Sequence, residues 1–265
     1  MVDSDYSPEF FADHVEKARS SAEAIVPHVL ELVAPGSVVD FGCGVGTWLA
    51  TFARHGVADY LGVDGEWVSP EMLEIPRERF VPARLDRPFE LGRRFDLAVS
   101  LEVAEHLPES AASAFVRSVA EHAPCVLFSA AVPHQGGLHH LNEQWPEYWV
   151  ELFAEYGHLV VDAIRPRIWT TPGVAFWYRQ NTFLYARPEV LAAHPLLATA
   201  RAHTNEKMLS VVHPRLLTHV AGDPAEHMRR LTAREHSLRE LAYAAPHVAA
   251  RSLRWWVGKL LRRST

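Results

Sequence analysis

The chain has 265 residues and a formal net charge of −6. This length suits one domain with a well-formed core plus an appendage, and the acidic balance argues against a general nucleic-acid binder. The N-terminus has early acids and no long apolar core, so we expect no signal peptide, and no apolar run approaches the length of a membrane span. The two cysteines, Cys43 and Cys125, are not expected to pair, which favours a reducing cytoplasm.

Hydrophobic periodicity predicts helices that alternate with strands along the chain. A first helix is expected over 8–33 and ends at Pro35-Gly36. This alternation predicts an α/β fold, a Rossmann-like, mostly parallel sheet of seven strands with helices on both faces. Ligands of such sheets bind outside the carboxyl ends of the strands. The expected strands are 38–41, 60–63, 80–83, 95–100, 125–131, 159–164 and 182–186, and the helices among them are 47–55, 109–122 and 146–156.

After Arg187 the sequence predicts only helices, which are broken at four prolines. We therefore divide the chain into a domain over 1–187 and a helical extension over 188–265. The last helix, 251–263, is basic and amphipathic. Two interpretations stay open: it packs on the protein's own core or on a dimer partner, or it makes a peripheral contact with the inner membrane face. The four prolines are Pro195, Pro214, Pro224 and Pro246.

The most informative segment is the glycine-rich run over 38–48. Glycine is needed where a chain turns tightly after a strand and a ligand approaches bare backbone. The spacing differs from the dinucleotide fingerprint, because Thr47 or Leu49 stands where its last glycine would be. The run therefore predicts a nucleoside site of another kind, built on Gly42, Gly44 and Gly46.

Two acids flank these glycines at the ends of adjacent predicted strands. Asp40 would repel a phosphate but could hold a cationic amino group, and Asp64 suits a pair of ribose hydroxyls. The expected ligand is therefore a nucleoside that carries an amino group and no phosphate.

A second cluster follows the predicted strand 95–100. Glu102, Glu105 and His106 are spaced i, i+3, i+4, so one helical turn would place them on one face. The loop after the next strand carries His134, His139 and His140, and its Gly136-Gly137 pair lets it fold back over the site. Carboxylates and imidazoles together can bind a divalent cation. Two alternatives stay open: a polar network without metal, and a general base at His106 or His140.

Four parts of the sequence together resemble the class I S-adenosylmethionine (SAM) methyltransferases, over about residues 35–187. They are the run 39–46, Asp64, the run 95–97 and the run 102–108. Four further runs look like a bacterial branch of this superfamily that is met in glycan and natural-product biosynthesis. They are 127–131, 135–137, 140–149 and 177–181. The Glu-x-x-Glu-His pattern with a later histidine is also similar to the small-RNA 3′-end 2′-O-methyltransferases and the ubiquinone-type catechol O-methyltransferases. In both of these groups the resemblance implies a divalent metal.

The resemblance implies a role for each candidate residue. Asp40 and the three glycines would surround the methionine part of SAM, and Asp64 would hold its ribose. Arg84 occupies the place of the usual adenine-binding acid, so that contact falls to Asp86 or to backbone alone. Glu102 is assigned to the SAM side as well as to the metal. The implied metal ligands are Glu102, Glu105, His106 and His140, with His139 in reserve, and the implied catalytic residues are His106 and His140.

The resulting hypothesis is a SAM-dependent O-methyltransferase, assisted by a divalent metal such as Mg or Mn. The acceptor would be a hydroxyl of a small molecule or glycan with neighbouring hydroxyls, because a cation that bridges two oxygens lowers the pKa of one of them. The alternatives are a small-RNA 2′-O-methyltransferase, which the acidic charge disfavours, and a non-catalytic SAM-binding scaffold.

Overall fold

The structure is a computed structural model that describes residues 8–221 of the chain. The predicted amphipathic helix 251–263 and the breaks at Pro224 and Pro246 lie outside the described residues. Among the described residues, no helix is both long and apolar enough to cross a membrane.

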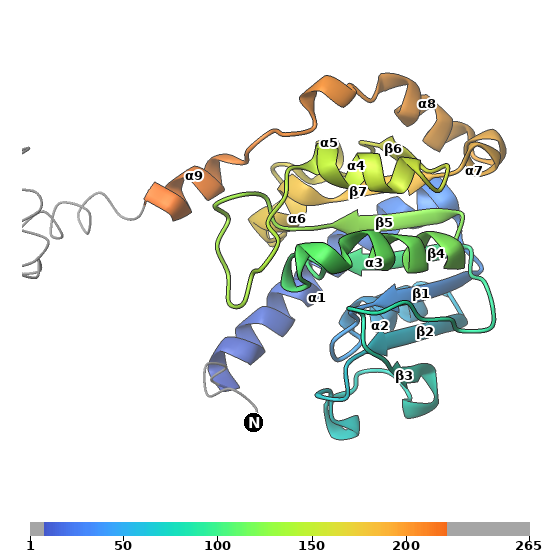
Figure 1. Ribbon diagram of the computed structural model, residues 1–265, viewed down its shortest axis with the longest axis vertical. Helices are drawn as coiled ribbons and strands as arrows, with labels where there is room; N and C mark the ends of the chain where they lie inside the picture. Colours follow the sequence, from blue (N-terminus) through green and yellow to red (C-terminus); the bar gives the residue numbers. More distant parts are fainter. Residues whose placement is uncertain (1–7, 222–265) are drawn as a thin grey trace, which may run out of the picture. The chain divides into compact units, whose positions relative to one another are not determined.

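A seven-stranded sheet forms the centre of the fold (Figure 1). The strand order is β3-β2-β1-β4-β5-β7-β6, and only β7 runs antiparallel to its neighbours. The predicted fold class is therefore confirmed. The strands are β1 (Ser37–Phe41), β2 (Asp59–Asp64), β3 (Phe80–Pro82), β4 (Leu97–Leu101), β5 (Cys125–Ser129), β6 (Leu159–Val161) and β7 (Phe183–Ala186).

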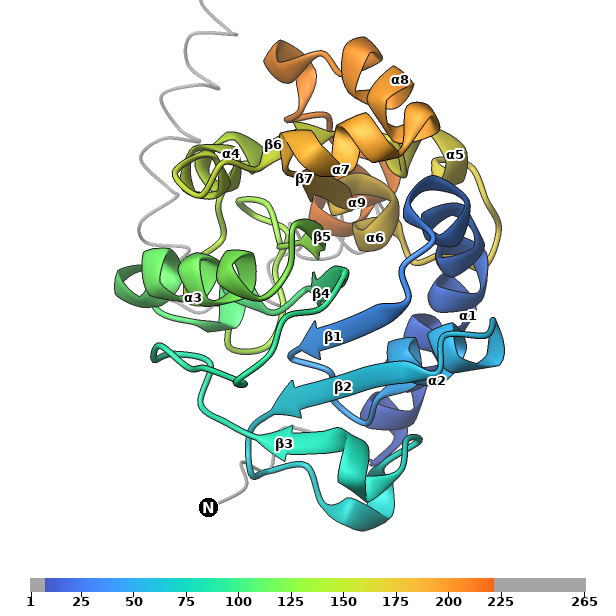
Figure 2. The same cartoon turned by 90° about the vertical axis from the view of Figure 1, so that its right-hand side faces the viewer.

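Helices cover both faces of this sheet. Figure 2 shows α3 and α4 on one side and α1 and α2 on the other. The described helices are α1 (Pro8–Val33), α2 (Thr47–Arg54), α3 (Glu109–His122), α4 (Pro146–Ala154), α5 (Arg165–Ile168), α6 (Phe176–Asn181), α7 (Pro188–Ala193), α8 (Pro195–His203) and α9 (Pro214–Ala221).

The central strands are nearly continuous apolar runs because both of their faces are buried. On β1, Val38 belongs to the core under α1 and α2, and the next residue, Val39, belongs to the core under α3 and α4. Both side chains are fully buried. The same alternation sends Leu127 and Phe128 of β5 to opposite faces. Strong burial on both faces fixes the register of these strands.

Several strands end earlier than the periodicity predicts. β5 stops at Ser129 and β6 at Val161, although the apolar runs continue to Ala131 and Ile164. These later residues are also buried, so apolar character marks burial in a loop as well as in a strand.

Helices α7 and α8, which follow the sheet, belong to the same compact unit. Leu197 of α8 is fully buried in the core under α1 and α2, together with Val190 of α7. The unit that contains the sheet extends through Leu216, and a second unit begins at Leu217. As predicted, α8 begins at Pro195 and α9 at Pro214.

His158, in the turn before β6, makes the stability of the fold sensitive to acid. Its ring is 1% exposed, and Nε2 donates to the carbonyl of Ala123 at 3.0 Å. Burial lowers the pKa of His158 to about 4, so the unfolded chain binds a proton first as the pH falls. We expect stability to be full above about pH 6.5 and to be lost toward pH 4, by about 3 kcal/mol at most.

Urea unfolding at pH 7.5 and pH 5 measures this loss. The variant His158→Gln keeps a donor for Ala123, and it should reduce the acid-dependent loss. His203→Gln, at an exposed position on α8, is the matched control and should unfold with the pH dependence of the unmodified protein. Equal slopes for all three proteins would contradict the assignment to His158.

Candidate SAM and metal site

The three glycines of the loop after β1 differ in what a side chain at each position would contact. All three adopt left-handed backbone, with φ of 85° at Gly42, 53° at Gly44 and 88° at Gly46. A Cβ at Gly42 would lie 2.3 Å from a methyl of Val103, and one at Gly46 would lie 2.8 Å from Ile75. A Cβ at Gly44 would meet nothing within 4 Å. Gly44 is therefore the position where a ligand can approach bare backbone.

Asp40 presents a buried carboxyl group beside this loop. Its side chain is 2% exposed, and Oδ2 has no hydrogen-bond partner among the described residues. Burial, followed by the charge of Asp64, raises the pKa of Asp40 well above its usual value. An ammonium group nearby would relieve this cost, since an opposite charge stabilises the ionised form. The orphaned oxygen and the open side of Gly44 fit the amino-acid part of SAM.

Asp64 lies directly against the same loop. Its Oδ2 accepts from the amide of Gly44 at 2.7 Å, and its Oδ1 accepts from the amide of Gly65 at 2.6 Å. Burial raises the pKa of Asp64. A Cβ at Gly65 would lie 2.5 Å from Trp67, whose side chain is 59% exposed beside this carboxylate. Trp67 was not predicted as a site residue, since no sequence pattern marks it.

Asp86 is engaged by a neighbouring arginine. Arg84 Nη2 and Nε bind its two oxygens at 2.5 and 3.0 Å, and this hydrogen-bonded pair lowers the pKa of Asp86. Arg84 is exposed. The pair follows β3, which lies beside Asp64 in the register Asp64↔Pro82. A contact of Asp86 with adenine stays a prediction.

Glu105, which follows β4, carries a buried carboxyl group. It sits in a 3₁₀ turn, Ala104–His106, just past the strand. The side chain is fully buried, and within residues 8–221 neither oxygen has a hydrogen-bond partner with good geometry. Burial and the nearby charge of Glu102 raise the pKa of Glu105 well above its usual value. Such a group is costly unless a cation or donor compensates it.

Glu102 is held differently, by two amide side chains. Its carboxylate accepts from Gln135 Nε2 at 2.9 Å and from Asn181 Nδ2 at 3.2 Å, and Asn181 also donates to Gln135 Oε1 at 2.9 Å. Glu102 has a φ of 54°, which is unusual for a side chain of this size. The predicted single helical turn is therefore broken at this residue. Gln135 and Asn181 were missed as site residues, although both lie in runs that carry the family resemblance.

The loop between β5 and α4 brings His140 to Glu105 and His106. One ligand atom from each of these three residues lies within 4.8 Å of the others, and the two imidazole rings meet edge to face at 4.8 Å between centroids. Backbone amides of Leu141 and Asn142 donate to the carbonyl of Glu105 at 2.7 and 3.0 Å, which ties the loop to the turn.

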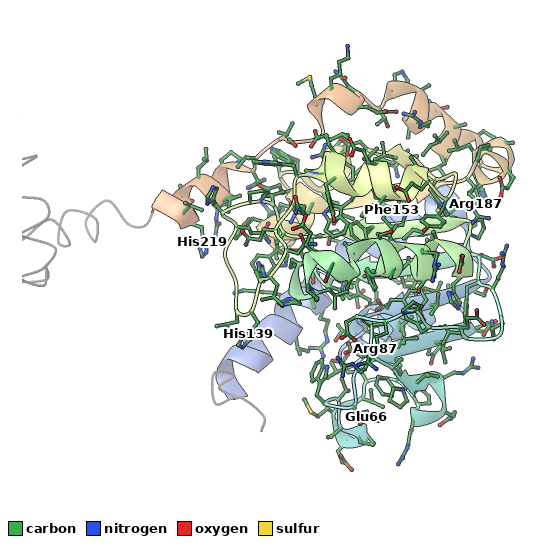
Figure 3. All side chains as sticks on the ribbon, viewed as in Figure 1. Glu66, Arg87, His139, Phe153, Arg187 and His219 are labelled. Carbon is green, nitrogen blue, oxygen red and sulfur yellow. The ribbon has the colours of Figure 1, made fainter. Side chains whose placement is uncertain are left out.

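The remaining predicted ligands lie outside this cluster of three. The Glu102 carboxylate is engaged by the amides of Gln135 and Asn181. His139 is exposed with a φ of 60°, near the outer end of the loop (Figure 3). His134 is also exposed. Their ligand roles stay predictions.

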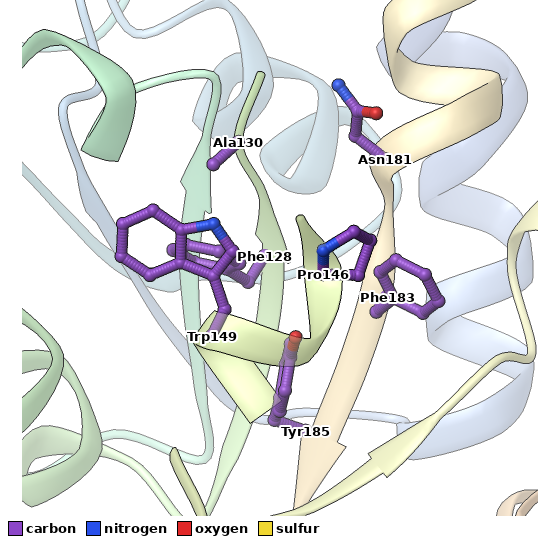
Figure 4. Close-up of a pocket in the computed structure, with 7 residues that line it drawn as sticks. All are labelled: Phe128, Ala130, Pro146, Trp149, Asn181, Phe183 and Tyr185. Carbon is purple, nitrogen blue, oxygen red and sulfur yellow. The ribbon is translucent and has the colours of Figure 1, made fainter. Parts of the chain in front are cut away.

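A small cavity lies between β5, β7 and α4 (Figure 4). Its free volume is about 10 Å³, far below the size of a substrate pocket. The lining is mostly aromatic and apolar, so it belongs to the core. The lining residues are Phe128, Ala130, Pro146, Trp149, Asn181, Phe183 and Tyr185.

A family comparison decides the class of this site. The model of a methyltransferase-domain family matches residues 14–163, which are 150 of the 265 residues. The chain belongs to this methyltransferase family. The prediction of a SAM-dependent methyltransferase is thereby confirmed at the level of the family. No curated protein matches the chain in sequence.

Solved structures of methyltransferases share the fold at low identity. The sugar N-methyltransferase KedS8 from Streptoalloteichus sp. ATCC 53650 is 17% identical with a TM-score of 0.52, over 71% of this chain and 96% of that one. An O-methyltransferase family protein from Burkholderia thailandensis is 13% identical with a TM-score of 0.50, over 68% of this chain and 59% of that one. The methyltransferase domain of the bacterial protein CtHen1 is 20% identical with a TM-score of 0.47, over 63% and 98%.

Proposed function

We propose that this methyltransferase transfers the methyl group of SAM to a hydroxyl of a small molecule or glycan, with the help of a divalent cation. The observation that carries the proposal is the grouping of Glu105, His106 and His140 within 4.8 Å, just past the end of β4. Adjacent β1 leads into the glycine loop. Donor side and acceptor side thus meet at the carboxyl edge of the sheet.

The side chains of this cluster fit a cation. The two buried oxygens of Glu105 have no partner with good geometry, and a cation would compensate their charge. One carboxylate with two imidazoles suits Mn²⁺ and other first-row ions better than Mg²⁺, which prefers an all-oxygen set. A cation bound there lowers the pKa of a hydroxyl that coordinates it and fixes that oxygen in position.

The residues of the chain then have separate tasks. Asp40 and Asp64 hold the amino group and ribose of the donor, and the bare backbone of Gly44 permits its approach. The acceptor oxygen bonds to the methyl carbon as the S–C bond of the sulfonium breaks, and the hydroxyl proton leaves to an imidazole or to water. Alignment of oxygen and methyl supplies a large part of the rate, about 7–11 kcal/mol in favourable cases.

Methyl transfer to a vicinal diol tests the proposal. The assay compares one sugar or catechol diol with its monodeoxy analogue, each with Mn²⁺ and with excess chelator. We expect chelation to lower the rate on the diol about 100-fold, Mn²⁺ to restore it, and the deoxy analogue to react poorly because it cannot bridge a cation. Full activity in chelator, or in a Glu105→Ala/His106→Ala double variant, would remove the metal from the mechanism.

Two further outcomes distinguish the alternatives. An amino sugar that reacts faster than its hydroxyl counterpart would assign the enzyme to N-methylation. RNA binding with a steep salt dependence would favour the alternative of a small-RNA 2′-O-methyltransferase, which the net charge of −6 disfavours. Turnover on any acceptor excludes a purely non-catalytic scaffold.

A further inference from the structure

The loop over 132–145 is folded around a single carboxylate, that of Glu143. Its Oε2 accepts from the amide of His134 at 2.8 Å, and its Oε1 accepts from the amide of Gly136 at 2.8 Å. His134 and Gly136 both have left-handed backbone, with φ of 68° and 71°. Three donors converge on Glu143, because its Oε1 also contacts His140 Nδ1 at 2.9 Å. These hydrogen bonds connect the first half of a loop without regular structure to its second half.

The contact with His140 determines the form of that imidazole. An ionised carboxylate can only accept hydrogen bonds, so Nδ1 must carry the proton that it donates to Glu143. The proton on one ring nitrogen of a neutral imidazole leaves the lone pair on the other. In the neutral ring, Nε2 is therefore the nitrogen that can bind a cation or take a proton.

Packing fixes the direction of the same ring. A Cβ at Gly137 would lie 2.2 Å from His140 Nε2, so glycine is required for the ring to remain where it is. The ring lies edge to face with His106, and the backbone amides of the next two residues, Leu141 and Asn142, donate to the Glu105 carbonyl. The side chain of His140 is only 12% exposed. Few other orientations are open to it.

We propose that Glu143 is a positioning residue, which holds His140, a member of the Glu105–His106–His140 cluster, in the tautomer with the proton on Nδ1 and the lone pair on Nε2. This inference rests on the proposed function, because it concerns the orientation of one proposed cation ligand. Metal-bound histidines commonly donate their second ring nitrogen to a carboxylate, and loss of that carboxylate typically weakens metal binding about 10–100-fold. Glu143 would act through His140 and would not contact the reacting atoms.

Glu143→Gln is the decisive variant because it is nearly isosteric and replaces one acceptor oxygen with a donor amide group. A glutamine can donate as well as accept, so it permits the opposite tautomer, with the proton on Nε2. Two readouts on the full-length protein follow. Calorimetry with Mn²⁺ alone measures the affinity of the cluster, and ¹⁵N NMR of the histidine side chains in metal-free protein reports which nitrogen of His140 is protonated. The His140 signal is identified by its loss in His140→Gln.

We expect Glu143→Gln to weaken Mn²⁺ binding about 10-fold or more and to shift His140 away from the Nδ1-protonated form. The thermal midpoint should fall as well, because the amide of His134 or Gly136 loses its acceptor. Glu143→Ala should weaken binding further. Glu151→Ala, which removes an exposed carboxylate from α4, should match the unmodified protein. Unmodified affinity in Glu143→Gln, or an unchanged tautomer, would overturn the inference.

The two proposals fail separately. If the unmodified protein binds no Mn²⁺, the cation is removed from the proposed function. The tautomer of His140 in the metal-free protein still decides the role of Glu143, because that measurement involves no metal. If Mn²⁺ binds but the tautomer does not depend on Glu143, the cation stays and only the positioning role is lost.

Discussion

Replacing Glu105 with methionine is expected to stabilise the metal-free protein while abolishing most of its activity. Glu105 is fully buried, and neither carboxylate oxygen has a partner with good geometry. A buried polar group without a partner costs about 1–3 kcal/mol, and an apolar side chain of similar volume removes this cost. We therefore expect the free energy of unfolding to rise by about 1–3 kcal/mol in chelator, and methyl transfer to fall about 100-fold or more.

Urea unfolding without and with Mn²⁺ measures the stability of the metal-free protein and the stabilisation that Mn²⁺ adds. Binding to the folded state adds stability that increases with the free concentration of the ion, so Mn²⁺ should stabilise the unmodified protein and have no effect on Glu105→Met. Glu121→Met, at an exposed position on α3, should change stability by less than about 0.5 kcal/mol and keep full activity. A Glu105→Met protein that is both less stable and fully active would show that Glu105 is a structural residue.

Two alanine substitutions in the glycine loop are expected to act on different properties, Gly42→Ala mainly on stability and Gly44→Ala mainly on SAM affinity. In Gly42→Ala the new Cβ lies 2.3 and 2.7 Å from the two methyls of Val103, at a φ of 85°. Backbone strain and overpacking together should lower the free energy of unfolding by about 2–4 kcal/mol. In Gly44→Ala the Cβ meets no atom within 4 Å at a φ of 53°, so the loss of stability should be about 1 kcal/mol.

SAM binding reverses the order of these two variants. Since the open side of Gly44 is the proposed approach of the ligand, Gly44→Ala should weaken SAM at least about 10-fold, an effect of about 1.4 kcal/mol. Calorimetry with SAM measures this affinity, and urea unfolding measures stability. In Gly42→Ala/Val103→Ala the obstructing methyls are gone, so part of the lost stability should return. Unchanged SAM affinity in Gly44→Ala would place the ligand elsewhere.

The order of helices and strands followed from the sequence because burial on both faces leaves a local signal. Strand β1 is a continuous apolar run with Val38 and Val39 on opposite faces of the sheet, and Gly42, Gly44 and Gly46 mark its turn. Such patterns lie within a few residues of one another. The ends of β5 and β6 were less predictable, since Ala131 and Ile164 are buried outside the sheet.

The chemistry of the second cluster was only partly visible in the sequence. The spacing of Glu102, Glu105 and His106 placed them together, but it could not show that Glu102 lies in left-handed backbone and is held by Gln135 and Asn181. Asn181 is distant in sequence from Glu102. Contacts of this kind depend on how two elements pack, and no local pattern records that packing.

By itself, the sequence determined the sheet, the glycine loop and the family of the protein, because each of these depends on residues close together in the chain. The tertiary structure decided which side chains share a site. It buried both oxygens of Glu105 with no well-aligned hydrogen-bond partner among the described residues, joined His140 to Glu105 and His106, and folded the intervening loop on Glu143. The physical reason is that the burial and partners of a polar group depend on segments that meet only in the folded chain.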